Sequence, residues 1–275
     1  MIRFDAVSKT YPGGTVAVED FSLRIPERTT TVFLGTSGCG KTTLMRMVNA
    51  MVTPTSGTVF VRGRDVADED PVRLRRSIGY VLQEGGLFPH RSIADNVATV
   101  PRLEGATKQA SRERALELLD LVGLDREMAD RYPAQLSGGQ RQRVGVARAL
   151  ANRADILLMD EPFGALDPIV RAELQRELKE IQRALGTTIL FVTHDVDEAF
   201  TLGDQVAVLS TGGHIEQVGT PTELLSSPAS PFVAEFVGAS RAARPVRVAG
   251  PGGLVVDDAG TPVGTLTRDE AGERP

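Results

Sequence analysis

One glycine-rich segment of the chain has the residue types needed to hold a phosphate group. Glycines let successive backbone N–H groups point at phosphate oxygens, and a helix beginning at Lys41 would favour an anion at its N-terminus. Lys41 would reach the β- and γ-phosphates of a nucleotide, and the Thr42 hydroxyl would ligate Mg²⁺. The segment matches the pattern G-x-x-x-x-G-K-[ST] and consists of Gly35, Thr36, Ser37, Gly38, Cys39, Gly40, Lys41 and Thr42, followed by Thr43.

A second group of residues could supply acid–base chemistry to such a site. The segment ILLMDE, residues 156–161, is an apolar run that ends in two carboxylates. Asp160 would stand at the end of a strand and suits a contact to Mg²⁺. Glu161 points elsewhere and could polarise a water that attacks the γ-phosphate. Acidic residues at strand ends are also common as solvated loop or capping residues, so the prediction depends on the phosphate-binding segment.

A third segment, residues 136–140, reads LSGGQ and precedes a basic helical stretch. Ser137, Gly138, Gly139 and Gln140 would stand at a helix N-terminus, where N–H groups and the helix dipole favour an anion. An ordinary capped helix is the alternative, because Ser is a usual N-cap residue.

These residues must be positioned by strands and helices that alternate along the chain. Residues 2–11 and 15–25 predict two strands joined by the turn PGG, and residues 29–35 predict a buried strand before a helix over 41–51. Further apolar strands alternate with helical patterns, which predicts an α/β fold with a mostly parallel sheet covered on both faces. Helical patterns dominate from residue 84 to 150 and predict a helical insertion. Two helical stripes are expected to be buried, namely Ala115, Leu116, Leu119 and Val122, and Leu174, Leu178, Ile181 and Leu185.

Composition limits the classes of function. The chain has 275 residues, 41% of them hydrophobic, and a formal net charge of −5, so nothing indicates a nucleic-acid partner held by bulk electrostatics. A single cysteine excludes an internal disulfide and fits a reducing compartment. The N-terminus lacks the apolar block of a signal peptide, and no apolar run reaches the roughly 18–20 residues of a spanning helix.

The LSGGQ segment, between a phosphate-binding loop and an acidic strand end, resembles the signature of the ATP-binding-cassette ATPases. The resemblance covers residues 1–240 and implies a P-loop NTPase (RecA-like) α/β core with an N-terminal antiparallel β subdomain and an inserted α-helical subdomain. It also implies ATP and Mg²⁺ as ligands. In that family two cassettes face each other head to tail, so Ser137 and Gly139 would contact the γ-phosphate held by a second copy of the chain.

The same resemblance implies roles for four further residues. Tyr11 matches the aromatic residue that stacks on adenine, and Gln83 matches the glutamine that contacts Mg²⁺ and the attacking water. Asp167, in GALDP, matches the loop that crosses the dimer interface, and His194, in FVTHD, matches the histidine that holds the γ-phosphate.

Within the family, the chain is similar to detached ATPase subunits of transporters, because it has one cassette and no coiled-coil insertion between Lys41 and Ser137. The stretches GYVLQEGGLFPHRSIADNVATVP and EPFGALDPIVR resemble those of importers for glycine betaine, choline or carnitine. This resemblance implies separate integral-membrane permease subunits, a solute-binding protein as an indirect partner, and a peripheral location on the cytoplasmic face of the membrane. Importers of amino acids, polyamines or sulfate, a soluble P-loop kinase and a non-hydrolytic regulatory binder are alternatives.

Residues 241–275 are expected to lie outside the nucleotide-binding domain of residues 1–240. The first part reads as a linker, and LVVDDAGTPVGTLT reads as a single hairpin around Asp-Asp-Ala-Gly. The hairpin resembles a truncated piece of a nucleotide-sensing module of the cystathionine-β-synthase type and is expected to be a remnant.

Overall fold

The computed structural model describes residues 1–238 and the backbone of three short strands, residues 246–248, 254–257 and 262–265. The chain forms two units, Met1–Pro221 and Thr222–Pro275. The first unit contains every residue with a predicted role in the site.

A four-stranded antiparallel sheet begins the first unit, with strand order β2-β1-β4-β5. The predicted strands and their PGG turn are confirmed, and alternate residues of β1 point inward, among them Ile2 and Phe4. The strands are β1 (Ile2–Thr10), β2 (Val16–Ile25), β4 (Ser56–Val61) and β5 (Arg64–Asp65).

The second sheet has six strands in the order β10-β9-β3-β8-β7-β6. Neighbouring strands from β9 to β6 are parallel and β10 is antiparallel to β9, so the predicted mostly parallel sheet is confirmed. All six residues of β3 and of β8 are buried, as expected for central strands covered on both faces. The strands are β3 (Thr30–Gly35), β6 (Gly79–Val81), β7 (Ile156–Asp160), β8 (Thr188–Thr193), β9 (Gln205–Ser210) and β10 (His214–Gly219).

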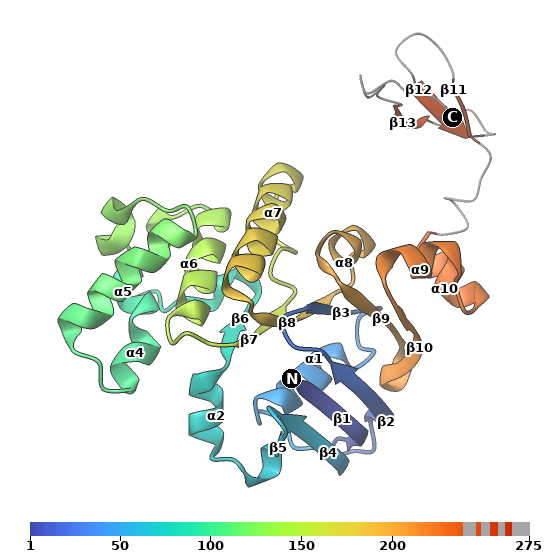
Figure 1. The fold of residues 1–275 in the computed structure, drawn as a ribbon, viewed down its shortest axis with the longest axis horizontal. Helices are drawn as coiled ribbons and strands as arrows, with labels where there is room; N and C mark the ends of the chain where they lie inside the picture. Colours follow the sequence, from blue (N-terminus) through green and yellow to red (C-terminus); the bar gives the residue numbers. More distant parts are fainter. Residues whose placement is uncertain (239–245, 249–253, 258–261, 266–275) are drawn as a thin grey trace. The chain divides into compact units, whose positions relative to one another are not determined.

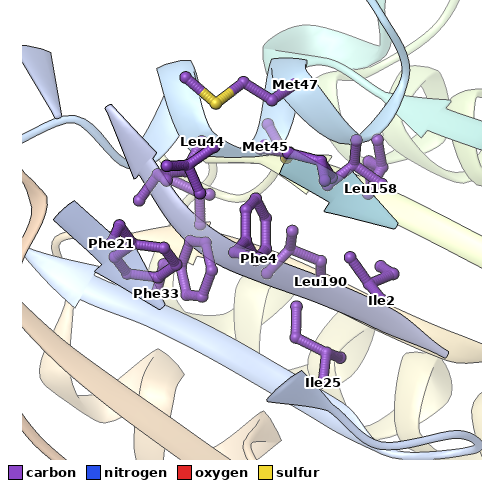
Figure 2. Packing of buried hydrophobic residues seen from close by; sticks show 14 of the residues in the cluster. Ile2, Phe4, Phe21, Ile25, Phe33, Leu44, Met45, Met47, Leu158 and Leu190 are labelled. Atoms are coloured by element: carbon purple, nitrogen blue, oxygen red, sulfur yellow. The ribbon is translucent and has the colours of Figure 1, made fainter. Parts of the chain in front are cut away.

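The hydrophobic core lies where the antiparallel sheet meets the six-stranded sheet and α1 (Figure 2). Phe4, Phe21 and Phe33 come from β1, β2 and β3, and their ring centroids are 5.2 to 6.2 Å apart. The Phe4–Phe21 and Phe21–Phe33 pairs are edge-on, which is the favourable arrangement for aromatic quadrupoles. This cluster fixes β3, and therefore the loop that follows it.

Helices surround the six-stranded sheet, and those between β6 and β7 form a separate group beside α7 (Figure 1, green). None of the helices among the described residues is both long and apolar enough to cross a membrane. The helices of the first unit are α1 (Lys41–Val48), α2 (Pro71–Ser77), α3 (Ile93–Val97), α4 (Thr99–Leu103), α5 (Lys108–Leu121), α6 (Gly138–Leu150), α7 (Pro168–Leu185) and α8 (Val196–Leu202). Short 3₁₀ turns are η1 (Val66–Asp68), η2 (Gln83–Gly86), η3 (Arg126–Asp130), η4 (Pro133–Gln135) and η5 (Thr211–Gly213).

The buried faces of two helices differ from the predicted stripes at one residue each. In α5, Ala115, Leu119 and Val122 are buried as predicted, but Leu116 is only partly buried and Leu118 is buried in addition, on the side that meets α3 and α6. In α7, Leu185 is half exposed at the last turn, where the helix ends at Gly186. Gln182 is buried instead and donates to the backbone oxygens of Arg28 and Thr187.

The second unit contains two short helices and a small sheet of order β11-β12-β13. The predicted hairpin is present as β12 and β13, but Val246–Val248, assigned to the linker, forms a third strand paired with β12. The rest of the predicted linker and the Asp-Asp-Ala-Gly turn beyond Asp257 lie outside the described residues. The elements are α9 (Pro221–Ser226), α10 (Pro231–Phe236), β11 (Val246–Val248), β12 (Leu254–Asp257) and β13 (Pro262–Thr265).

Candidate nucleotide-binding site

The predicted phosphate-binding segment forms the turn between β3 and α1. Gly40 is the N-cap of α1 with a φ of 107°, and a Cβ there would lie 2.4 Å from the backbone oxygen of Ala17. Only glycine therefore fits at this position. Lys41 is 4% exposed, and its Nζ donates to the backbone oxygens of Gly35 (2.7 Å) and Thr36 (2.8 Å). The lysine cation is thus held inside its own loop, beside the N-terminus of α1.

Asp160, at the C-terminal end of β7, faces this loop. The Thr42 hydroxyl donates to Asp160 Oδ1 at 2.9 Å, and the Tyr80 hydroxyl lies 3.5 Å from Asp160 Oδ2. Burial raises the pKa of Asp160, while the bond from Thr42 and the charge of Arg46 oppose this shift. Hydroxyl and carboxylate oxygens are ligands that Mg²⁺ prefers, so these two residues fit a magnesium site. Among the described residues, no group of three or more His, Cys, Asp or Glu side chains could hold a metal by itself.

Glu161 follows Asp160 and points toward the end of the neighbouring strand β8. Its φ is 45°, which is rare for a residue with a side chain, and its N–H donates to the backbone oxygen of Val192 at 3.0 Å. Glu161 Oε2 lies 3.3 Å from His194 Nδ1. Strained backbone of this kind costs about 1–3 kcal/mol and clusters at functional sites. With this backbone conformation, the Glu161 carboxylate contacts the His194 ring.

A partly buried ionic network, which the sequence motifs do not indicate, supports the turn that carries His194. Arg171 on α7 donates to Asp195 Oδ2 at 3.2 Å and to the backbone oxygen of Leu166 at 3.1 Å. Glu198 is 2% exposed and accepts a 2.7 Å bond from the Thr193 hydroxyl. Burial is the largest effect on Glu198 and raises the pKa of its carboxyl. Arg171 therefore ties the turn after β8 to the turn that precedes α7.

Gln83 lies at the start of η2, with one residue between it and the short edge strand β6. Its Nε2 atom would be 3.7 Å from a Cβ placed on Gly164, in the turn that follows Glu161. The side chain therefore extends toward the end of β7. The structure brings Gln83 close to the same edge of the sheet as Asp160 and Glu161.

Tyr11 stands at the rim of the phosphate-binding loop. The residue is 38% exposed, its hydroxyl lies 3.4 Å from Thr43 Oγ1, and the Lys9 ammonium lies 5.3 Å from the ring centroid. An exposed aromatic face next to the loop could take a nucleotide base by stacking.

The LSGGQ segment begins α6 and is not part of this cluster. Ser137 caps the helix, accepting from the Gln140 N–H at 3.2 Å, while the Gln140 side chain accepts from the Ser137 N–H at 2.9 Å. Gly138 and Gly139 pack on Leu166 and Val170, at either side of Asp167. Asp167 caps α7 by accepting from the N–H groups of Ile169 and Val170. Among the described residues, no hydrogen bond or ion pair joins residues 137–140 or 167 to the phosphate-binding loop.

The arrangement defines a P-loop nucleotide-binding domain of the α/β class, because the phosphate loop after β3 and both acidic residues after β7 stand at the same carboxyl edge of the sheet, on either side of the parallel strand β8. A family model described as ABC transporter matches residues 18–164. The chain belongs to the ABC transporter family.

Curated relatives and solved structures agree with this assignment. The chain is 52% identical over 241 residues to the carnitine transport ATP-binding protein OpuCA of Listeria monocytogenes, covering 88% of this chain and 60% of the relative. It is also 52% identical, over 88% of this chain and 63% of the relative, to the choline transport ATP-binding protein OpuBA of Bacillus subtilis. The chain thus spans less than two thirds of the length of both relatives.

A dimeric structure of the ATP-binding cassette MJ0796, in a post-hydrolysis state bound to ADP and Pi, has the same fold. It superposes with a TM-score of 0.73 at 33% identity and covers 80% of this chain and 99% of that one.

Proposed function

We propose that the chain binds and hydrolyses ATP at the loop between β3 and α1. The observation that carries this proposal is the convergence of Lys41, Thr42, Asp160, Glu161 and His194 at one edge of the sheet. Strands β3, β8 and β7 are adjacent and parallel, so residues that follow their carboxyl ends meet there. The loop backbone and Lys41 would bind the phosphates, and the exposed ring of Tyr11 would stack on the adenine.

The residues at this edge have distinct roles in the proposed reaction. Mg²⁺ held by Thr42, Asp160 and Gln83 would neutralise charge on the β- and γ-phosphate oxygens. Glu161 accepts a proton from the water that attacks the γ-phosphorus atom, and the bond from that atom to the bridging oxygen breaks. His194, fixed by its contact with Glu161, donates to the γ-phosphate. The hydrogen bond from Thr42 keeps Asp160 oriented toward the loop.

We further propose that the competent form is a head-to-tail homodimer that forms with ATP. Ser137, Gly138, Gly139 and Gln140 make a capped helix N-terminus, and in the described part of the chain no hydrogen bond or ion pair joins it to the phosphate-binding loop. An N-terminus of this kind attracts an anion, and the γ-phosphate held by a second copy would supply it. Asp167, at the adjacent N-terminus of α7, would lie at the interface. The dimeric cassette of similar fold supports this arrangement.

The whole assembly is proposed to import a quaternary amine such as glycine betaine, choline or carnitine. The relatives named as carnitine and choline transport ATP-binding proteins support this solute class. The chain would work at the cytoplasmic face of the membrane as a peripheral subunit, with separate permease subunits and a solute-binding protein acting outside, and without a nucleic-acid partner.

The Glu161→Gln variant tests the site and the dimer together. Glutamine keeps the size of the side chain but cannot take the proton, and general-base assistance is worth about 10²- to 10⁴-fold in rate. Phosphate release should fall by that factor while ATP still binds. Gel filtration should then show a dimer with ATP and mostly monomer with ADP, because closure depends on the triphosphate.

The exposed Glu180→Gln variant on α7 is the matched control and should hydrolyse ATP like the wild type. A Glu161→Gln protein that turns over at the wild-type rate, or stays monomeric at saturating ATP, would contradict the assignment. Phosphate transfer to a small-molecule acceptor, in place of release, would favour a P-loop kinase.

A further inference from the structure

The turn that carries Gln83 is packed directly onto the helix that begins with the LSGGQ segment. Gly85 in η2 has a φ of 75°, and a Cβ there would lie 2.6 Å from the backbone oxygen of Arg141. On the helix, a Cβ on Gly145 would lie 2.9 Å from the Cα atom of Gly85. The two backbones touch at these glycines, since neither position has room for a side chain.

Arg148, one turn further along α6, stabilises this contact with two hydrogen bonds. Its Nη2 atom donates to the backbone oxygen of Gly85 at 2.7 Å, and its Nη1 atom donates to that of Gly86 at 2.8 Å. Among the described residues no carboxylate forms an ion pair with Arg148, and burial lowers the pKa of its guanidinium. Arg148 is partly buried, so its guanidinium has lost part of its contact with water, and the two carbonyl oxygens replace those hydrogen bonds.

The chain beyond the turn is held at a second point. Asn96 is fully buried, accepts from the Phe88 N–H at 2.7 Å and donates to the Phe88 backbone oxygen at 3.1 Å. The Arg148 guanidinium carbon lies 6.0 Å from the centroid of the Phe88 ring. The segment from η2 to Phe88 is therefore bound to the helical group at both ends, while Gln83 at its start points toward Gly164.

We propose that Arg148 is a positioning residue that makes the Gln83 turn and α6 move as one piece. A shift of Gln83 at the nucleotide of one chain then moves Ser137, at the N-terminus of the same helix, toward or away from the nucleotide of the partner chain. Arg148 contacts neither nucleotide and acts only through these two elements. The inference rests on the proposed function, since it needs Gln83 at one nucleotide and Ser137 at another.

A double-mutant cycle between Arg148 and Gln83 tests the proposal. If Arg148 acts through Gln83, Arg148→Ala should lower kcat of the wild type about tenfold but have little further effect on Gln83→Ala. Affinity of the isolated chain for a fluorescent ATP analogue should stay within about twofold, because the phosphate-binding loop is untouched. Arg143→Ala is the matched control on the same helix. Arg143 pairs with Glu173 and Glu177 of α7 and not with the Gln83 turn. Arg143→Ala should therefore lower kcat by the same factor in the wild type and in Gln83→Ala.

Two measures keep the test decisive. Arg148→Lys keeps the charge but loses the planar fork that spans two carbonyl oxygens. It should therefore lower kcat less than Arg148→Ala does, and this loss should again largely disappear in the Gln83→Ala background. If turnover of Gln83→Ala is too low to measure, the Kd of the ATP-bound Glu161→Gln dimer replaces kcat as the readout.

The proposal would be overturned if Arg148→Ala lowered kcat, or weakened the dimer, by the same factor in the wild type and in Gln83→Ala. Parallel losses of ATP affinity, dimer formation and melting temperature, which indicate a merely structural arginine, would also overturn it. Failure of the wild type to hydrolyse ATP would instead overturn the proposed function.

Discussion

At the scale of single residues, Lys41 has the clearest expected effect. Its ammonium lies within its own loop, held by two backbone oxygens, and is ready to turn to a phosphate. Lys41→Ala should abolish ATP hydrolysis and weaken ATP binding about 10- to 150-fold, since hydrogen bonds to charged groups contribute about 1.5–3 kcal/mol. Isothermal titration and a phosphate-release assay measure the two effects. The exposed Lys108→Ala variant is the control, and near-normal turnover of Lys41→Ala would remove the phosphate-loop assignment.

Glu198 should make stability depend on pH. Burial raises its folded-state pKa above the ordinary value of about 4.5, so the folded chain binds more protons than the unfolded chain above that pH. Its contribution to the free energy of unfolding is therefore greatest below about pH 4.5 and falls as pH rises toward the folded-state pKa. Glu198→Gln removes this loss and should gain stability relative to the wild type as pH rises.

Urea unfolding of both proteins across that pH range measures the difference. The exposed Asp197→Asn variant on the same helix is the matched control. A difference between wild type and Glu198→Gln that does not change with pH would contradict the role of burial at this carboxyl.

At the scale of elements, the sequence pattern predicts where turns and strand ends lie better than it predicts which side chains contact one another. The sequence motifs locate the loop after β3 and the carboxylates after β7, because turns and strand ends depend on local residue types. The sequence pattern does not predict that Leu118 is buried in α5 and Leu116 only partly, because this depends on packing against α3 and α6. Arg171 and Arg148 are missed for the same reason. Arg148 donates to a backbone oxygen 63 residues earlier in the chain and Arg171 pairs with Asp195, 24 residues later, and arginine in a helix carries no sequence signal for such a partner.

The N-terminus of α6 can be tested by mixing two damaged chains. Ser137→Arg places a bulky cation where the γ-phosphate of the partner would lie and removes a helix cap worth about 1 kcal/mol. In a mixed dimer with Lys41→Ala, both lesions fall on one composite site and the other site is intact. ATPase activity should therefore appear in the mixture and be absent from either homodimer. Wild-type activity of pure Ser137→Arg would show that this helix does not close over a nucleotide.

At the scale of the whole molecule, the proposed solute is tested by adding the partner proteins that the proposed function requires. Reconstituted in vesicles with the permease and solute-binding protein of the proposed import system, the chain should drive uptake of labelled glycine betaine, choline or carnitine. Uptake should need ATP and should fall at least about 100-fold with Glu161→Gln, in line with loss of the general base. Uptake of an amino acid, a polyamine or sulfate instead would leave the ATPase assignment intact and change only the solute.

The place of β3 in its sheet has a consequence for how the protein is made. Thr30 pairs with Ile189 and Thr31 with Gln205, so both neighbours of this strand are synthesised long after it. At about 5–20 residues per second, the ribosome needs roughly ten to forty seconds to produce them. During that interval the apolar strand has two open edges, which invites association with other nascent chains. The phosphate-binding loop is thus among the first parts to be translated and among the last to acquire its shape.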